Sequence, residues 1–351
     1  MPKADESPSA LSTARKLQAL LCVDCYPVPA VSVQLIETHF AWVFMVGEHA
    51  YKMKKPIVFP SLDLRSVADR QHNCLQEVRL NRRLAPDVYL GAVPLVLTKD
   101  GALRVDGQGS AVDWLVWMKR LPAAAMLDRA LTERTATAVA LAEVGALLAR
   151  FYERQPRYFY PASDYLSRLA ERTTADGAAL LAPQLELDAE SINAAVAAVH
   201  ASLNVLRVEL GNRALEGRIV ECHGDLRPEH ICLAPVCVID SLEFSQQLRV
   251  LDPAEELAYL RLECEVAGAP EVAQRIIDAY MQRSCDRFSD RLLDCYQSCR
   301  ALVRAKILAW HILDPAVASL APWTQQARAY LALAERHATS ASNSRSRVSN
   351  P

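Results

Sequence analysis

The stretch His223-Gly224-Asp225-Leu226-Arg227-Pro228-Glu229-His230, followed by VCVID from Val236 to Asp240, decides the fold of this 351-residue chain. Asp240 ends an apolar run, and a loop with a short hairpin can return it and Asp225 to one edge of a cleft. Two carboxylates placed in this way can divide their work. One orients a hydroxyl and accepts its proton, while the other holds a metal ion.

A β-rich segment precedes this stretch, and a helical one surrounds it. Short alternating apolar runs predict antiparallel strands at Val31 to Glu37, Ala41 to Val46, Ala50 to Lys54, Ala92 to Leu97, Leu103 to Val105 and Trp114 to Met118. A helical period predicts one helix, from about Ser66 to Leu84, among these strands.

After Pro122 alanine becomes abundant, and helical patterns run through Leu127 to Tyr152, Ile192 to Leu210, and Pro253 to about Ala338. The sequence thus predicts an α+β fold. Its parts are an N-terminal extension (1–25), a β-rich lobe (26–118), a helical lobe (119–338) that contains the 223–240 stretch, and a disordered tail (339–351).

The composition narrows the class of protein. The formal net charge of -2 gives no overall attraction to nucleic acid or to an anionic membrane. No apolar run approaches the ~20 residues of a membrane helix, and the polar N-terminus lacks the apolar core of a signal peptide. We therefore expect a cytoplasmic protein with neither a membrane nor a nucleic-acid partner, while its oligomeric state stays open. The lone CxxC at Cys22 and Cys25 cannot complete a tetrahedral zinc site.

The octapeptide resembles the protein-kinase catalytic loop, H-R-D-L-x-x-x-N, which is followed by D-F-G, with Gly224 in place of the arginine. The form HGD is similar to that of aminoglycoside and choline phosphotransferases. Four segments resemble a bacterial group of aminoglycoside phosphotransferase-like enzymes: HFAWVFMVGEHAYKMKKP, EVRLNRRLAPDVYLG, HGDLRPEHICL and VIDSLEF. The resemblance spans about residues 30 to 335 and implies a two-lobed protein-kinase-like fold, without the P-loop domain of some relatives.

The resemblance also implies ATP and Mg²⁺ as cofactors, and it assigns roles by position. Asp225 matches the catalytic base and Asp240 the metal-binding aspartate. Lys52, in A-x-K, would reach the α- and β-phosphates; Lys54, on the same strand face, ranks second. Glu77 would form an ion pair with the lysine.

Further roles follow from the same resemblance. The backbone near Met118 and Lys119 would bind adenine, and Asp252 would brace the catalytic loop. His230 replaces the usual metal-binding asparagine, and imidazole is a poor Mg²⁺ ligand. His230 would then contact phosphate, or Glu243 would hold a second metal. The turn at Thr38-His39-Phe40 lacks the glycines of a kinase phosphate loop.

Each residue also has an ordinary structural explanation. Asp225 can be a turn residue, Lys52 a solvated charge, Glu77 a surface ion-pair partner, Asp240 a strand-end carboxylate, and Asp252 the N-cap of a helix that begins with proline. The His230 substitution also permits a nucleotide-binding pseudokinase with a scaffold role.

The favoured hypothesis is an ATP-dependent kinase that phosphorylates a small hydroxylated molecule. A protein acceptor is disfavoured because no obvious activation segment of a eukaryotic-type protein kinase is present. Residues between Asp128 and Arg218 would build the acceptor pocket, with Asp164 and Tyr165 as candidates.

Overall fold

The computed structural model describes residues 11–59, 62–312 and 321–343, which form two compact units. Unit 1 comprises Met1–Arg129 and Glu229–Leu248, and unit 2 comprises Ala130–Pro228 and Arg249–Pro351. The predicted boundary at residue 118 placed 229–248 in the helical lobe. In the structure this segment joins unit 1, because Cys232 and Cys237 pack in one of its apolar cores.

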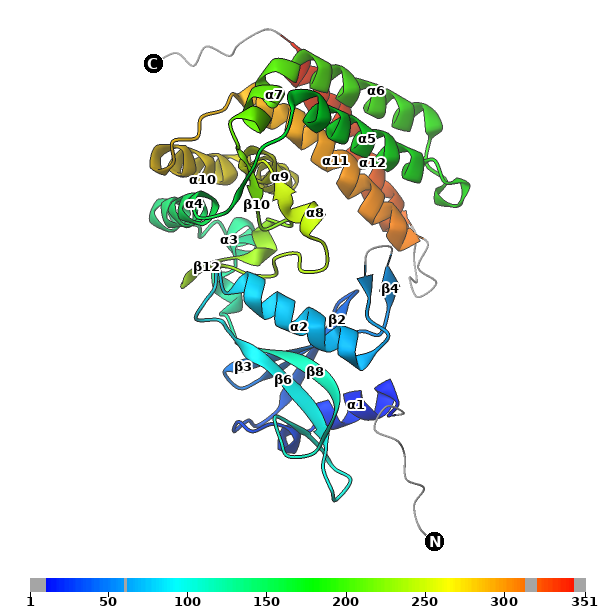
Figure 1. Ribbon diagram of the computed structural model, residues 1–351, viewed down its shortest axis with the longest axis vertical. Helices are drawn as coiled ribbons and strands as arrows, with labels where there is room; N and C mark the ends of the chain where they lie inside the picture. The colour runs from blue at the N-terminus through cyan, green and yellow to red at the C-terminus, as the bar shows by residue number, and fades with distance from the viewer. Residues whose placement is uncertain (1–10, 60–61, 313–320, 344–351) are drawn as a thin grey trace. The chain divides into compact units, whose positions relative to one another are not determined.

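Unit 1 is built on a six-stranded antiparallel sheet in the order β1-β2-β3-β8-β6-β7 (Figure 1). The strands are β1 (Val33–Glu37), β2 (Ala41–Val46), β3 (His49–Lys54), β6 (Tyr89–Leu97), β7 (Leu103–Val105) and β8 (Ser110–Lys119). Lys52 pairs with Val43 of β2 and with Val116 of β8, so it lies on a central strand. The predicted strands are confirmed, with ends shifted by a few residues.

Helix α2 (Val67–Asn81) packs against β8 and β6. Ser66 caps its N-terminus by accepting a hydrogen bond from the Asp69 N–H. Cys74 and Val78 of α2 pack with Tyr89 and Val116 of the sheet. This packing presents Glu77, on the same helix, toward the β3 lysines. A small hairpin, β4 (Val58–Phe59) and β5 (Leu62–Asp63), precedes α2.

The N-terminal segment belongs to the core of unit 1 over the residues that the structure describes. Helix α1 (Thr13–Leu20) and the 3₁₀ turn η2 (Val23–Cys25) contribute Leu20 and Cys25 to the apolar cluster. Lys16 donates to Asp113 at 2.8 Å, and Arg70 of α2 binds the same carboxylate with two nitrogens. The predicted extension at 1–25 is thus tied to the sheet and to α2 from residue 11 onward.

The two strands β11 (Ile231–Leu233) and β12 (Val236–Val238) form a hairpin in unit 1. Unit 2 contains the short strands β9 (Arg157–Tyr158), β10 (Ile219–Glu221) and β13 (Val250–Leu251). Its helices after α3 (Leu127–Glu133) are α4 (Ala138–Glu153), α5 (Ala162–Leu180), α6 (Ala189–Val205), α7 (Arg207–Leu215), α9 (Pro253–Val266), α10 (Pro270–Arg283), α11 (Asp290–Ile312) and α12 (Ala321–Ser342), whereas the short α8 (Gln246–Arg249) lies at the unit boundary.

Two helical predictions need correction. The single pattern over Leu127 to Tyr152 is two helices, which are separated near Arg134, a residue with φ of 57°. Residues 339–342, expected to be disordered, continue α12, where Ala338 and Ala341 are buried. The rest of the predicted tail, 344–351, lies outside the described residues.

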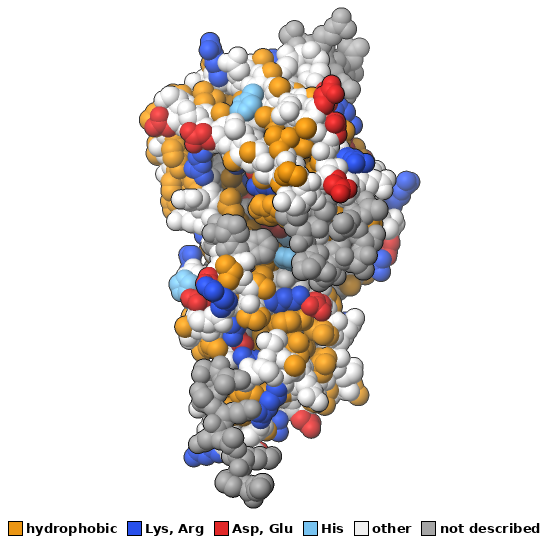
Figure 2. Space-filling model, turned by 90° about the vertical axis from the view of Figure 1, so that its right-hand side faces the viewer, with side chains coloured by type: hydrophobic (Ala, Val, Ile, Leu, Met, Phe, Trp, Pro, Cys, Tyr) orange, Lys and Arg blue, Asp and Glu red, His pale blue; other side chains and the backbone are white. Residues whose placement is uncertain are grey.

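On the face drawn in Figure 2, basic and acidic side chains are interspersed among apolar ones, in keeping with the small net charge. Within the described ranges, no single helix has the length and apolarity of a membrane span. The bent pair α6 and α7 passes that test only when its two helices are taken together.

Candidate active site

Lys52 stands between two carboxylates in unit 1. Its Nζ lies 3.0 Å from Oε1 of Glu77 on α2 and 2.6 Å from Oδ1 of Asp240, which follows β12. The Lys52 side chain is 14% exposed, whereas Glu77 is fully buried. Strand β3, helix α2 and the 229–248 segment thus bring three of the predicted site residues together.

Lys54 makes a second, deeper pair of contacts. It forms ion pairs with Oε2 of Glu77 and, at 2.6 Å, with Oε1 of Glu243. Its side chain is 1% exposed, so it is enclosed by its two carboxylate partners. Glu77 therefore holds both lysines, and Lys54 ties α2 to the segment after Asp240. The two lysines share Glu77, but Lys52 also binds Asp240, whereas Lys54 also binds Glu243.

The backbone beside Asp240 is anchored by two buried side chains that the sequence analysis did not identify. The Asp240 N–H donates to the Tyr89 hydroxyl at 3.0 Å, and the Ser241 N–H donates to Oδ1 of Asn81 at 2.8 Å. Asn81 in turn donates to the Glu77 carbonyl oxygen. Asn81, four residues after Glu77 on α2, thus connects the lysine-binding glutamate to the aspartate.

Asp240 has a φ of 61°, in the left-handed region that side chains other than glycine seldom occupy. Aspartate tolerates this region better than most residues. The hydrogen bonds that the Asp240 and Ser241 N–H groups donate to Tyr89 and Asn81 hold the strained turn in place. Backbone strain of this kind is concentrated at functional sites in proteins.

Opposite charges control ionisation in this cluster. Burial lowers the pKa of Lys52, but Asp240, Glu77 and Glu243 outweigh burial and raise its pKa well above the ordinary value. Burial raises the pKa of Asp240, yet Lys52 and His230 bring it well below the ordinary range. Both groups are therefore charged throughout the neutral pH range.

His230 precedes β11, and its Nε2 lies 3.7 Å from Oδ2 of Asp240. The hairpin β11–β12 sets this proximity, because the Ile239 N–H donates to the His230 carbonyl oxygen at 2.9 Å. His230 is thus beside the predicted metal-binding carboxylate, as its place in the octapeptide led us to expect.

In unit 2, Glu256 of α9 holds the backbone of the catalytic-loop sequence. Its carboxylate accepts hydrogen bonds from the N–H groups of His223 and Gly224, and from the Tyr152 hydroxyl. Gly224 has a φ of 92°, which explains why glycine occupies this position. Glu256 is fully buried, and this burial raises its pKa despite the donated hydrogen bonds.

Asp225 follows this braced turn and is partly buried. Oδ1 of Asp225 accepts a hydrogen bond of 3.3 Å from the hydroxyl of Tyr259, one helical turn after Glu256 on α9. The Asp225 N–H donates to Nδ1 of His223 at 3.2 Å. Helix α9 therefore orients both the backbone and the side chain of the predicted base.

The predicted brace, Asp252, has a different set of contacts. It caps α9 by accepting from the Ala254 N–H, and its two oxygens bind Arg213 at 2.5 and 2.7 Å. The Tyr296 hydroxyl also donates to Asp252. The capping alternative is thus confirmed, and Glu256 makes the direct loop contacts. The segment AEELAYL offers two adjacent carboxylates, Glu255 and Glu256, among apolar residues, and the sequence alone does not distinguish them.

Met118 and Lys119 end β8, as expected for the strand that leaves the β-rich unit. The Lys119 N–H donates to the Val88 carbonyl oxygen at 2.9 Å, so this donor is already used within unit 1. The adenine assignment stays a prediction. Asp164 and Tyr165 lie near the start of α5 in unit 2, where the Tyr165 hydroxyl bonds to that of Tyr296 in the core.

A model of the phosphotransferase enzyme family matches residues 62–293, which include Glu77, Asp225, Asp240 and Glu256 and begin after Lys52 and Lys54. The chain belongs to the phosphotransferase enzyme family. This confirms the family and the class of enzyme that the HGD sequence predicted, and membership favours an enzyme over a scaffold pseudokinase.

Curated relatives of this phosphotransferase-family chain include an uncharacterized protein of Mycobacterium tuberculosis and one of Mycobacterium bovis. Each is 30% identical over 291 residues, which is 81% of this chain and 56% of the relative. The chain thus spans about half the length of these relatives.

Solved structures share the fold at low identity. A choline/ethanolamine kinase family protein from Mesorhizobium loti has a TM-score of 0.53 at 14% identity, covering 90% of this chain and 93% of its own. A spectinomycin phosphotransferase, solved with ADP and spectinomycin, has a TM-score of 0.53 at 14% identity, covering 92% and 98%. The protein-kinase-like α+β fold is thereby confirmed.

The carboxylates of unit 1 provide oxygen ligands of the kind that Mg²⁺ takes in kinase-like proteins. Asp240, Glu77 and Glu243 outnumber Lys52 and Lys54 by one charge. The Asp240 side chain is 42% exposed; its Oδ1 binds Lys52, and its Oδ2 lies 3.7 Å from His230 Nε2. Among the described residues, no group of three or more His, Cys, Asp or Glu forms a metal cage. Mg²⁺ commonly takes one or two carboxylates and completes its shell with water and phosphate oxygens, so the donor set fits.

Proposed function

We propose that this chain transfers the γ-phosphoryl group of ATP to a hydroxyl group of a small molecule. The observation that supports this most strongly is the meeting of Lys52, Glu77 and Asp240 in unit 1. A lysine fixed by a helix glutamate, beside a carboxylate on a strained turn, is the arrangement that positions nucleotide phosphates in kinase-like enzymes.

Each residue has a defined task in this proposal. Lys52, oriented by Glu77, binds phosphate oxygens; Asp240 and Glu243 supply oxygen ligands for Mg²⁺, which neutralises phosphate charge when bound. His230 donates a hydrogen bond to phosphate. Met118 contacts the adenine.

Asp225 is the base. The acceptor oxygen forms a bond to the γ-phosphorus while the bond from phosphorus to the bridging oxygen breaks, and the hydroxyl proton passes to Asp225. ADP leaves with the bridging oxygen. Glu256 and Tyr259 fix Asp225 for this step. Because phosphoryl transfer depends mainly on positioning and electrostatics, such support has a direct effect on rate.

The experiment is a screen for ADP release with sugars, aminoglycosides, amino alcohols and nucleosides, repeated with Asp225→Ala. The variant is expected to lose transfer while it keeps nucleotide binding, measured by titration calorimetry. Turnover equal to that of the unaltered chain would refute the role of Asp225. Nucleotide binding without transfer to any acceptor would instead support the scaffold hypothesis.

A further inference from the structure

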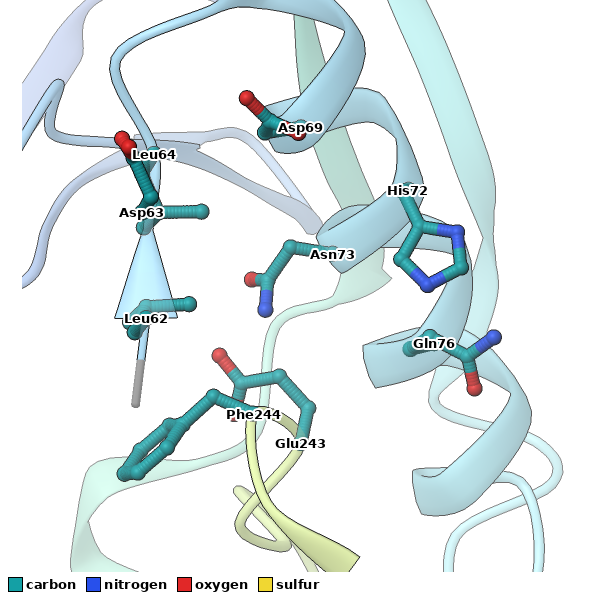
Figure 3. Close-up of a pocket in the computed structure, with 9 residues that line it drawn as sticks. All are labelled: Leu62, Asp63, Leu64, Asp69, His72, Asn73, Gln76, Glu243 and Phe244. Atoms are coloured by element: carbon teal, nitrogen blue, oxygen red, sulfur yellow. The ribbon is translucent and has the colours of Figure 1, made fainter. Parts of the chain in front are cut away.

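A cavity of about 150 Å³ lies in unit 1, beside the lysine–carboxylate cluster. Its walls come from the β5 region, the N-terminal half of α2, and the segment after Asp240 (Figure 3). The residues around it are Leu62, Asp63, Leu64, Asp69, His72, Asn73, Gln76, Glu243 and Phe244. The volume equals that of roughly five water molecules.

Asn73 provides a polar group in the wall of this cavity that could bind a ligand. Its side chain is buried, with 5% of the residue exposed, and Oδ1 has no hydrogen-bond partner among the residues that the structure describes. A buried acceptor without a partner costs free energy, so it calls for a donor from a bound molecule. In Figure 3 the Asn73 amide nitrogen points toward the Glu243 carboxylate, and its oxygen points toward the side of the cavity that Leu62 and Asp63 line.

The charge of the residues around the cavity indicates whether the bound donor is neutral or positively charged. Three carboxylates, those of Asp63, Asp69 and Glu243, line the cavity, and its described lining residues include no lysine or arginine. Arg65 already neutralises Asp63 from outside, and Ser66 donates to Asp69. Glu243 gives one oxygen to Lys54, and a carboxylate can accept further hydrogen bonds at its second oxygen.

We infer that this cavity binds a small organic cation that carries N–H donors, an ammonium or guanidinium group. Its donors bridge Asn73 Oδ1 and the Glu243 carboxylate. Its charge is balanced by Asp69 and by the one carboxylate by which Asp240, Glu77 and Glu243 exceed Lys52 and Lys54. Because Glu243 also binds Lys54, which pairs with Glu77, an occupant contacts the same ion-pair chain that holds α2. Binding itself does not depend on the proposed phosphotransfer.

The test is a ligand-observed NMR titration with methylguanidinium chloride in the millimolar range. Saturable binding is expected, at least tenfold tighter than that of methylurea, which has nearly the same shape without the charge. Tetramethylammonium, a cation without N–H donors, is expected to bind no better than methylurea. Equal binding of all three probes, or non-saturating binding, would overturn the inference.

Variants separate this cavity from other acidic surfaces. Asn73→Leu removes the acceptor at similar volume and is expected to weaken methylguanidinium binding about tenfold or more. Asn73→Asp adds a carboxylate and is expected to tighten it, which keeps the test decisive if the leucine variant folds poorly. Asn204→Leu, at an exposed position on α6, is the control. Unchanged binding in both Asn73 variants would count against this site. The NMR titration does not measure ADP release. If the chain released no ADP with any acceptor, the conclusion about this cavity would therefore be unaffected.

Discussion

Lys52 Nζ lies 2.6 Å from Asp240 Oδ1, although 188 positions separate the two residues in the chain. The contact joins a central strand of the sheet to the turn after the β11–β12 hairpin. Glu77 occupies the other side of the lysine. The Lys52 ammonium group is thus fixed between two carboxylates, and such preorganisation is the main source of electrostatic catalysis.

Replacing Lys52 by methionine tests this contact. The side chain keeps its length and loses its charge, so we expect kcat/KM for ATP to fall by about 100- to 1000-fold, the usual loss when one preorganised donor is removed. Steady-state kinetics measures the effect. Lys55→Met is the matched control, because the partners of Lys55 are the exposed Glu37 and the Trp42 ring. Similar losses in both variants would remove Lys52 from its assigned role.

Replacing Lys54 is expected to lower the stability of the fold, because Lys54 is enclosed between Glu77 and Glu243. Lys54→Met leaves two buried carboxylates short of a partner, and breaking a buried ion pair costs about 3–5 kcal/mol. Urea unfolding is expected to show this loss in stability.

A second variant isolates the cause of that loss. Adding Glu243→Leu to Lys54→Met removes one of the stranded carboxylates and should recover part of the stability, which a double-mutant cycle measures. If the double variant is no more stable than Lys54→Met alone, the Lys54–Glu243 pair does not account for the effect.

The sequence was sufficient to predict the six strands of the main sheet of unit 1 and the pairing of Lys52 with Glu77, but not the small β4–β5 hairpin. Alternating apolar residues mark strands directly, and the A-x-K and HGD segments have strong local signatures. The grouping of His230 and Asp240 with the β-rich unit was not predictable in this way. It depends on the packing of Cys232 and Cys237 with Cys74 and Val116, which are remote in the chain.

The same reason explains the supporting residues that were missed. Tyr89 and Asn81 act through hydrogen bonds to backbone groups more than 150 positions away, and composition gives no sign of such contacts. Asp252 and Glu256 lie four residues apart on α9, so their side chains share one side of the helix. Only the three-dimensional contacts show that Glu256 meets the loop while Asp252 binds Arg213.

Glu256→Gln tests the brace behind Asp225. Glutamine has one acceptor oxygen and places an N–H₂ group against a backbone N–H, so the turn at Gly224 shifts. We expect kcat to fall by about 10- to 100-fold, because a small misplacement of a reacting group slows the reaction by about that much. Little change is expected in KM for ATP. Glu255→Gln is the control, since Glu255 is equally buried but pairs with Arg172 and Arg300. A loss of kcat that is equal in both variants, per folded molecule, would contradict the bracing role.

His337 of α12 makes the stability of unit 2 depend on pH. Its Nε2 lies 2.8 Å from Oε2 of Glu265 on α9, and its Nδ1 lies 3.5 Å from Oδ1 of Asp294 on α11; Arg336 also contacts Glu265. Burial lowers the pKa of His337, but the two carboxylates outweigh burial and raise it above 6.5. The protonated form therefore stabilises the folded state.

The sign of the pH effect follows from this raised pKa. The stabilisation is complete below the unfolded pKa of about 6.5 and is lost as the pH rises through the higher folded value, at a slope of at most about 1.4 kcal/mol per pH unit. The urea midpoint is expected to fall above pH 6.5, and His337→Gln should flatten that fall while lowering stability at pH 6. A variant with the same pH profile as the unaltered chain would show that another group is responsible, because Gln cannot take up the proton that links α12 to α9 and α11.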